Sequence, residues 1–408
     1  MRATSKLLAA TAIVAASSAS ATDLEVMHWW TSGGEAAAVS EFAKAFDATG
    51  HTWVDAAIAG GENARAVMVS RLTGGDPMGA FQFNHGRQAE ELIESGLLRD
   101  ITDIAEAEGW LDLVNPPSLL EACTVEGRVY CAPVNIHSWQ WLWVSHDAFA
   151  DAGLPVPGNW AEFAAGADKL AAAGKIPLAM GQQGWQQSGA FNVMMASLLP
   201  SEIFTSVYGD KDTDVAASAD VATVFAAAAE ARDMAAKSTV QNWNDATNLV
   251  ITGQAGGQIM GDWAQGEFAV AGSVAGEDYS CLPGLGTNPR LSTGGDAFYF
   301  PVLDDADQSA AQAELAALLL KPATQVSFNL AKGSLPVRGD IDLSAANDCM
   351  QKGLGLLADG ALLPDVNMLA TPDTVNQINT LFTEFFADAS ISAADAQARF
   401  VDIIADAE

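Results

Sequence analysis

The chain has 408 residues, of which 50% are hydrophobic and 17% are charged, and its formal net charge at pH 7 is −32. This charge argues against nucleic acid or an anionic lipid surface as a partner, since both repel an acidic protein. The length exceeds what a single hydrophobic core usually serves, so we expect two lobes.

The first 21 residues are predicted to be a secretory signal and not part of the fold. Arg2 and Lys6 precede an apolar run over residues 7–16, and small residues then lead to a predicted cleavage site before Thr22. No Cys follows that site to carry a lipid, and the apolar run is too short for a lasting membrane anchor. We therefore expect an exported, unanchored protein of a bacterial periplasm, with a net charge of −34 once the two basic residues of the signal are removed.

The pattern of apolar residues beyond the signal predicts an α/β fold. A first strand over residues 24–28 ends in the pair Trp29-Trp30, and a Gly-rich turn follows. Strand ends that open into loops are where open α/β sheets bind ligands. Further strands are predicted at 79–83, 129–134, 139–144, 176–179, 257–260 and 297–301, and helices at 35–46, 63–72, 90–94, 160–173, 191–199, 221–236, 373–386 and 393–405.

The chain has four cysteines. An even number in an exported protein indicates two disulfides, and four cysteines can be paired in three ways. We favour Cys123 with Cys131, which would close a short hairpin-like loop, and Cys281 with Cys349, which would join distant segments. A zinc site is the alternative, but neither CxxC nor HxxxH occurs in the sequence.

Tryptophans placed beside polar residues are the strongest indication of a binding site. Besides Trp29 and Trp30, this pattern is found at Trp185 between Gln183 and Gln186, at Trp243 between Asn242 and Asn244, and at Trp263 between Asp262 and Gln265.

A sugar needs this combination, because an indole can cover its apolar C–H face while each buried hydroxyl needs a polar partner. Charged partners make the stronger hydrogen bonds, and we nominate Asp262, Asp296 and Lys332 for that role. For each Trp the alternative is ordinary packing, and for each Asp it is a helix cap or a turn.

Several motifs in this order resemble the glucose/mannose-type sugar-binding proteins of bacterial ABC transporters. These proteins belong to the extracellular solute-binding family that includes maltose-binding protein. The similar motifs are Trp29-Trp30 and residues 81–86, 125–130, 133–137, 260–263 and 332–340.

The resemblance implies a two-lobe periplasmic binding protein that closes on a monosaccharide, with glucose as the first choice, and presents it to a membrane permease. A monomer is the default expectation, and we expect no cofactor or metal. The lobes would comprise residues 22–134 with 294–340, and 138–293 with 345–408, joined by hinges near 134–138, 290–296 and 340–345.

The family's ligand residues correspond to seven positions of this chain. The aromatic pair corresponds to Trp29 and Trp30, and the other contacts correspond to Gln82, His85, Trp263, Asp296 and Lys332. Where relatives have a His after a late Pro, this chain has Asn367, and where they have Arg and a polar residue after the hinge His137, it has Ser138-Trp139-Gln140-Trp141. The resemblance therefore does not identify the sugar.

Two other functions fit part of the sequence. A secreted glycoside hydrolase needs two carboxylates at a set separation, which 51 acidic residues will provide somewhere whether or not the protein is an enzyme. A binding protein for a cationic solute such as glycine betaine could use the tryptophans through cation–π attraction, although Lys332 would repel such a ligand.

Overall fold

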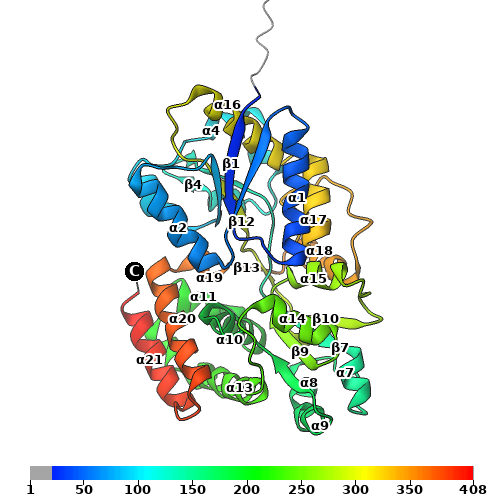
Figure 1. Ribbon diagram of the computed structural model, residues 1–408. Helices are drawn as coiled ribbons and strands as arrows, with labels where there is room; N and C mark the ends of the chain where they lie inside the picture. Colours follow the sequence, from blue (N-terminus) through cyan, green and yellow to red (C-terminus); the bar gives the residue numbers. More distant parts are fainter. Residues whose placement is uncertain (1–20, 408) are drawn as a thin grey trace, which may run out of the picture.

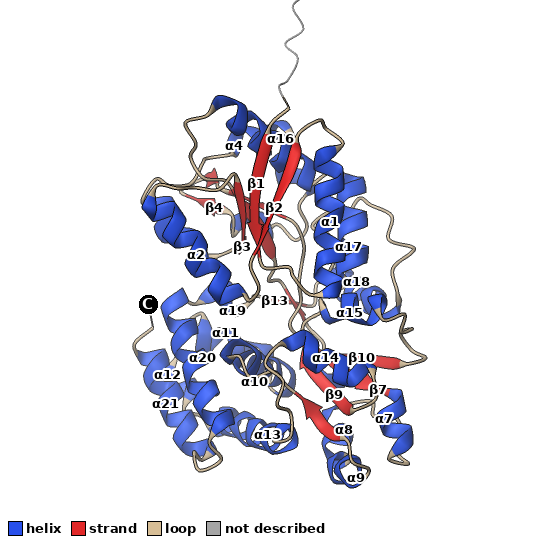
Figure 2. Cartoon of the chain, viewed as in Figure 1, coloured by secondary structure: helices blue, strands red, loops and turns tan. Residues whose placement is uncertain are grey.

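The computed structural model describes residues 21–407, so the predicted signal segment lies outside the described residues except for Ala21. The described chain forms two lobes, one above the other in Figure 1, and each is built on a β-sheet flanked by helices (Figure 2). This α/β architecture confirms the predicted fold class. Among these residues no helix is both long and apolar enough to cross a bilayer.

The first lobe contains a five-stranded sheet of order β2-β1-β3-β12-β6. Its first three strands are parallel, and β12 runs antiparallel to β3 and to β6. The strands are β1 (Asp23–His28), β2 (Thr52–Ala57), β3 (Ala80–Asn84), β6 (Cys131–Pro133) and β12 (Asp296–Tyr299).

The helices of the first lobe share one hydrophobic core with this sheet. They are α1 (Gly33–Asp47), α2 (Gly61–Gly74), η1 (Arg87–Ala89), α3 (Glu90–Glu94), α4 (Thr102–Ala107), α5 (Trp110–Leu113), α6 (Ser118–Glu121), α16 (Ala306–Leu319), α17 (Pro322–Lys332) and α18 (Asp348–Ala358). A short hairpin of β4 (Thr124–Val125) and β5 (Arg128–Val129) lies beside them.

The second lobe contains a four-stranded sheet of order β10-β7-β9-β8. Its central strand β7 (Trp141–Ser145) is buried along its whole length. Leu142 and Val144 pack into one hydrophobic cluster while Trp141 and Trp143 pack into another, as alternation along a strand covered on both faces requires. The other strands are β8 (Ile176–Ala179), β9 (Ala255–Met260) and β10 (Tyr279–Pro283).

Helices cover both faces of this second sheet. They are α7 (His146–Asp151), α8 (Trp160–Ala165), α9 (Ala167–Ala172), α10 (Gly184–Leu198), α11 (Ser201–Tyr208), α12 (Thr213–Ala216), α13 (Ala219–Ala235), α14 (Trp243–Ile251), α15 (Ala264–Val270), η2 (Gly284–Gly286), α19 (Val366–Leu369), α20 (Pro372–Ala387) and α21 (Ala393–Ala405).

Some elements differ from the sequence prediction. The helix predicted at 160–173 is divided into α8 and α9 at Gly166. The strand predicted from residue 139 begins at Trp141, which leaves Trp139 in the connection before it. The helix predicted at 191–199 begins earlier, at Gly184, so Trp185 lies in the first turn of α10.

The chain passes between the lobes at residues 134–140, after β6, and again at 284–295, after β10. A parallel pair of short strands, β11 (Leu291–Ser292) and β13 (Leu362–Leu363), lies at the junction. We predicted a third crossing near 340–345 and a second lobe that resumes at 345. The crossing comes after α18 instead, because Val337 and Met350 belong to the core of the first lobe and Leu354 packs against it.

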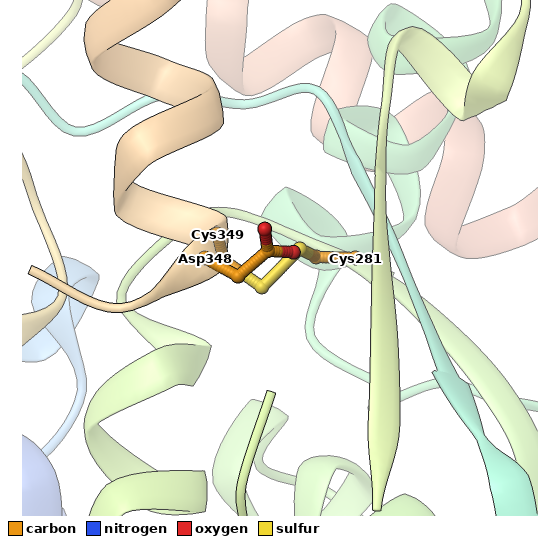
Figure 3. Close-up of side chains that lie close together, drawn as sticks. All are labelled: Cys281, Asp348 and Cys349. Atoms are coloured by element: carbon orange, nitrogen blue, oxygen red, sulfur yellow. A yellow bond between two sulfur atoms is a disulfide. The ribbon is translucent and has the colours of Figure 1, made fainter. Parts of the chain in front are cut away.

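Both predicted disulfides are confirmed: Cys123 pairs with Cys131, and Cys281 pairs with Cys349. Figure 3 shows the second bond with Asp348 beside it. These three residues are close enough to suggest a metal site, but both sulfur atoms are already in the disulfide. Because Cys281 lies on β10 and Cys349 on α18, this bond links the sheet of the second lobe to a helix that packs on the first.

Candidate functional site

A cleft of about 1290 Å³ lies between the two lobes and is lined by side chains from both. On the first lobe it borders the carboxyl ends of β1 and β3 and the start of β12, where Asp296 pairs with Asn84. On the second lobe it borders the first turns of α10 and α14 and the turn before α15. The first-lobe wall comprises Trp29, Glu35, Asp296 and Lys332, and the second-lobe wall comprises Trp139, Trp185, Trp243 and Trp263.

Asp296 is the most constrained residue of the first-lobe wall. Its Oδ1 accepts a hydrogen bond from Gln82 Nε2 at 2.8 Å, and its Oδ2 accepts one from Asn135 Nδ2 at 2.9 Å. The Nδ1 of His137 lies 3.2 Å from Oδ2. Burial alone would raise the pKa of Asp296, but the charge and hydrogen bond of His137, with the charge of Lys332, hold that pKa well below its usual value. Asp296 is therefore a fixed, buried carboxylate that borders the cleft.

The pKa of His137 shifts in the opposite direction. Burial would lower it, but the neighbouring carboxylates, Asp296 first among them, raise it above the usual value for histidine. The structure pairs His137, a residue of the predicted hinge, with Asp296. Its ring also contacts Trp263, with centroids 5.1 Å apart, so it touches both walls.

Lys332 and Glu35 form a buried ion pair in the first-lobe wall. The Nζ of Lys332 lies 3.3 Å from Oε1 of Glu35, and both side chains are less than 10% exposed. The Oγ of Ser32 also donates to Glu35, at 3.1 Å. Burial raises the pKa of Glu35, while the charge of Lys332 opposes that rise. Lys332 is thus present at the cleft as predicted, but its charge is already matched within the protein.

The two adjacent tryptophans have different surroundings. Trp29 is half-buried on the cleft surface, with the guanidinium carbon of Arg65 5.6 Å from the centroid of its ring. Trp30 borders the cleft but is only 1% exposed, because its ring packs against Phe42, Phe298 and Phe328. We predicted that both rings cover the ligand. This packing assigns most of the Trp30 ring to the core.

Three other predicted residues lie behind the cleft surface and do not line it: Gln82, His85 and Asp262. Gln82 accepts a hydrogen bond from the backbone of Trp29 at 3.0 Å and donates to Asp296, so it joins the ends of two strands. His85 is enclosed, and burial, followed by the charge of His137, lowers its pKa to about 3. Asp262 accepts from the backbone of Ser138 at 2.8 Å, and burial raises its pKa to about 7.

The second-lobe wall is a cluster of four indoles. Trp263 is at its centre, and its ring centroid lies 4.9 Å from that of Trp139 and 6.4 Å from those of Trp185 and Trp243. The rings of Trp139 and Trp243 stand nearly perpendicular to Trp263, at 86° and 84°. This edge-to-face packing is the favoured geometry for aromatic pairs. The predicted residues Trp185, Trp243 and Trp263 are therefore brought together.

Amide side chains surround the indoles. Gln183, Asn242 and Asn244 line the cleft, and Gln183 Oε1 accepts a hydrogen bond from the indole nitrogen of Trp185 at 2.9 Å. Asn367 also lines the cleft, on α19, but both ends of its amide are engaged: Nδ2 donates to Asp365 at 2.7 Å and Oδ1 accepts from Gln88 at 3.4 Å. Asn367 thus links the lobes, because Gln88 lies on η1 of the first lobe.

Glu35 and Trp139 line the cleft but are not among the site residues predicted from the sequence. The motif Ser32-x-x-Glu35 is a helix capping box, which gives Glu35 a local role that hides its pairing with Lys332, 297 positions along the chain. Trp139 was included in a predicted strand. The signal that could have identified it was the departure from the related sequences at 138–141.

The sequence model of the family described as bacterial extracellular solute-binding protein matches residues 30–326. A probable sugar-binding periplasmic protein of Brucella melitensis is 36% identical over 336 residues, which cover 81% of this chain and 79% of the relative. A protein of the same description from Rhizobium meliloti is 34% identical over 360 residues, which cover 87% of this chain and 86% of the relative.

Solved structures with a similar fold include two solute receptors. The bacterial receptor AcbH, described as having an exclusive preference for β-D-galactopyranose, has a TM-score of 0.77 and 18% identity, covering 94% of this chain and 98% of its own. Maltose-bound MalE3 of T. maritima has a TM-score of 0.74 and 15% identity, covering 94% of this chain and 99% of its own. At these identities the likeness concerns the fold alone.

Proposed function

The chain belongs to the bacterial extracellular solute-binding protein family, and from this premise we propose that it is the periplasmic receptor of an ABC importer, binding a monosaccharide. Glucose is our first choice of ligand. The observation that carries the proposal is one cleft with hydrogen-bonding charges on the first-lobe wall and indoles on the second-lobe wall. The descriptions of its relatives as sugar-binding periplasmic proteins support it.

The chemistry of a pyranose explains why two unlike walls are useful. Its C–H face is apolar and can lie on Trp29 or on the indoles opposite, which removes both surfaces from water. Its hydroxyls need partners at fixed directions, and a buried hydroxyl without one costs roughly 1–3 kcal/mol. Asp296 can accept from hydroxyls and Lys332 can donate to them, as charge-assisted bonds.

Binding would be coupled to closure of the lobes. A ligand that touches both walls binds the closed state better than the open state, and only that difference in affinity can shift the equilibrium between them. The crossings at residues 134–140 and 284–295 are the segments that would bend. The closed form would then be recognised by the membrane permease, with the sugar unchanged.

Among the predicted contacts, we assign direct roles to six residues that line the cleft: Trp29, Trp185, Trp243, Trp263, Asp296 and Lys332. Gln82 would act through Asp296, since both ends of its amide bond to protein groups. His85 and Asp262 would act from behind the wall, and Asn367 would help hold the lobes together. Trp30 would mainly support Trp29 and Lys332, whose Nζ lies 5.5 Å from the Trp30 ring.

A glycoside hydrolase is the second candidate, and one observation favours it. Glu35 and Asp296 both line the cleft, and their pKa values shift in opposite directions, as an acid and its partner do in such enzymes. However, Glu35 is bound to Lys332 and Ser32, which compete for the oxygens that a general acid must present to substrate. Incubation with radiolabelled sugars and glycosides distinguishes the two candidates, because turnover would overturn the receptor proposal.

A receptor for a cation such as betaine is less well supported. A quaternary ammonium group is held against open aromatic faces. In the second-lobe wall the edge-to-face contacts of Trp263 with Trp139 and Trp243 leave little space between those rings for a cation.

The test is titration calorimetry of refolded, ligand-free protein against glucose, galactose, mannose, xylose and glycine betaine. Refolding matters because a copurified ligand stabilises the protein and hides binding. We expect micromolar or tighter binding of at least one monosaccharide and none of betaine. Binding heat with betaine and with none of the sugars would contradict the proposed ligand class.

A further inference from the structure

Trp139 occupies an unusual position for a residue of the cleft. It lies in the first crossing between the lobes, two residues before β7, and its half-buried ring lines the cleft. It also packs against both hydrophobic clusters of the second lobe. The ring is therefore part of the cleft surface and part of the support behind it.

A gap in α10 receives this ring. Gly189 lies inside that helix, where glycine is unfavourable because its backbone is the most flexible in the unfolded chain. A Cβ atom built on Gly189 would lie only 2.6 Å from Cη2 of Trp139 and less than 3 Å from two more ring carbons. The indole thus takes the space that a side chain on α10 would fill, and Gly189 itself borders the cleft.

The same ring fixes its aromatic neighbours. Its centroid lies 4.9 Å from that of Trp263 at 86°, and 5.8 Å from that of Trp185 at 75°. A ring pushed away from α10 would have to change these contacts. Trp139 therefore determines how Trp263 is presented to the cleft and how far the cleft extends toward Gly189.

We propose that Trp139, seated against Gly189, determines the size of sugar that the cleft accepts. The indole holds Trp263 for one pyranose ring and fills the space between Trp263 and α10 that a second ring of a disaccharide would need. Trp139 is in this sense a specificity-determining residue. The inference rests on the proposed sugar-binding function and adds to it a preference for single-ring ligands.

The experiment compares Gly189→Ala and Trp139→Ala with wild type, and uses Gly355→Ala as the matched control. Gly355 is an exposed glycine inside α18 with no atom near its missing Cβ, so Gly355→Ala changes helix propensity without displacing a ring. Calorimetry measures Kd for three pairs of sugars: glucose and maltose, galactose and lactose, xylose and xylobiose. Circular dichroism verifies that each variant is folded.

For the monosaccharide that wild type binds, we expect Gly189→Ala to raise Kd by about tenfold, the upper range for loss of one aromatic contact. Gly355→Ala should leave Kd unchanged. Trp139→Ala should weaken binding of the monosaccharide. It should also raise the ratio of disaccharide affinity to monosaccharide affinity by roughly tenfold or more.

Three results would overturn the inference. The first is equal affinity in Gly189→Ala and Gly355→Ala. The second is an unchanged affinity ratio in Trp139→Ala, which would make the ring merely structural. The third is a wild type that binds no sugar, which would overturn the proposed function as well. If wild type does bind sugar, either of the first two results overturns this inference alone.

Discussion

The two walls of the cleft are held in place by different forces. In the first-lobe wall, Asp296 and Lys332 are charged groups whose positions are set by other polar groups, such as Gln82 and Glu35. In the second-lobe wall, indoles are positioned by contact with one another. Hydrogen bonds are directional and buried charges are costly to leave unpaired, whereas packing depends mainly on area and shape. Substitutions should therefore act mostly on stability in the first wall and mostly on affinity where an indole of the second is exposed.

The largest effect is expected from breaking the ion pair of the first-lobe wall. Lys332→Met leaves Glu35 buried without its partner, and loss of one member of a buried pair costs about 3–5 kcal/mol of unfolding free energy. The double variant Glu35→Gln/Lys332→Met removes both charges and should recover most of that loss. Urea denaturation measures both. A loss below about 1 kcal/mol in the single variant would mean that charge does not hold this wall.

The two disulfides close chain segments of different length, and only the longer one links the lobes. Replacing Cys281 and Cys349 by Ala opens a link between residues 68 apart, while replacing Cys123 and Cys131 opens one between residues 8 apart. Chain entropy predicts losses of about 4 and about 2.5 kcal/mol, respectively. Thermal and urea unfolding of the two double variants give the comparison. Equal losses would show that the bond from β10 to α18 adds nothing through its longer span.

Two tryptophans of the second-lobe wall separate packing from ligand contact. Trp263 is 7% exposed and touches four aromatic rings, so Trp263→Ala should cost about 3 kcal/mol of stability as well as affinity. Trp185 is half-buried, and Trp185→Ala should reduce affinity by about 1 kcal/mol with a smaller effect on unfolding. Calorimetry and thermal denaturation measure the two quantities. Equal stability losses would contradict the packing difference.

A pH-dependent effect on stability is expected behind the first-lobe wall. Because burial lowers the pKa of His85 to about 3, the unfolded chain binds more protons than the folded chain between that value and about 6.5. Stability should therefore be lost as pH falls through this window, by about 2 kcal/mol at pH 5 from this residue. His85→Gln cannot titrate, so the curve of unfolding free energy against pH should be flatter for the variant. Parallel curves would mean that His85 does not contribute.

Much of the site could be predicted because its signals are local. Trp185, Trp243 and Trp263 stand beside polar residues in sequence, and all three line the cleft. The two disulfides followed from the number and spacing of the cysteines. The α/β fold and the solute-binding family followed from apolar periodicity and from motifs in a characteristic order, and both are confirmed.

The remaining roles depend on contacts between distant parts of the chain. The sequence places Trp29 and Trp30 side by side after a strand, but only the fold decides which ring meets the cleft and which meets Phe328. The motifs identify Gln82, His85 and Asp262, but only tertiary packing puts them behind the cleft surface. Composition and local pattern thus determined what kind of site this is. Which side chain serves it was decided by burial, because burial depends on neighbours that lie as far away in sequence as Lys332 does from Glu35.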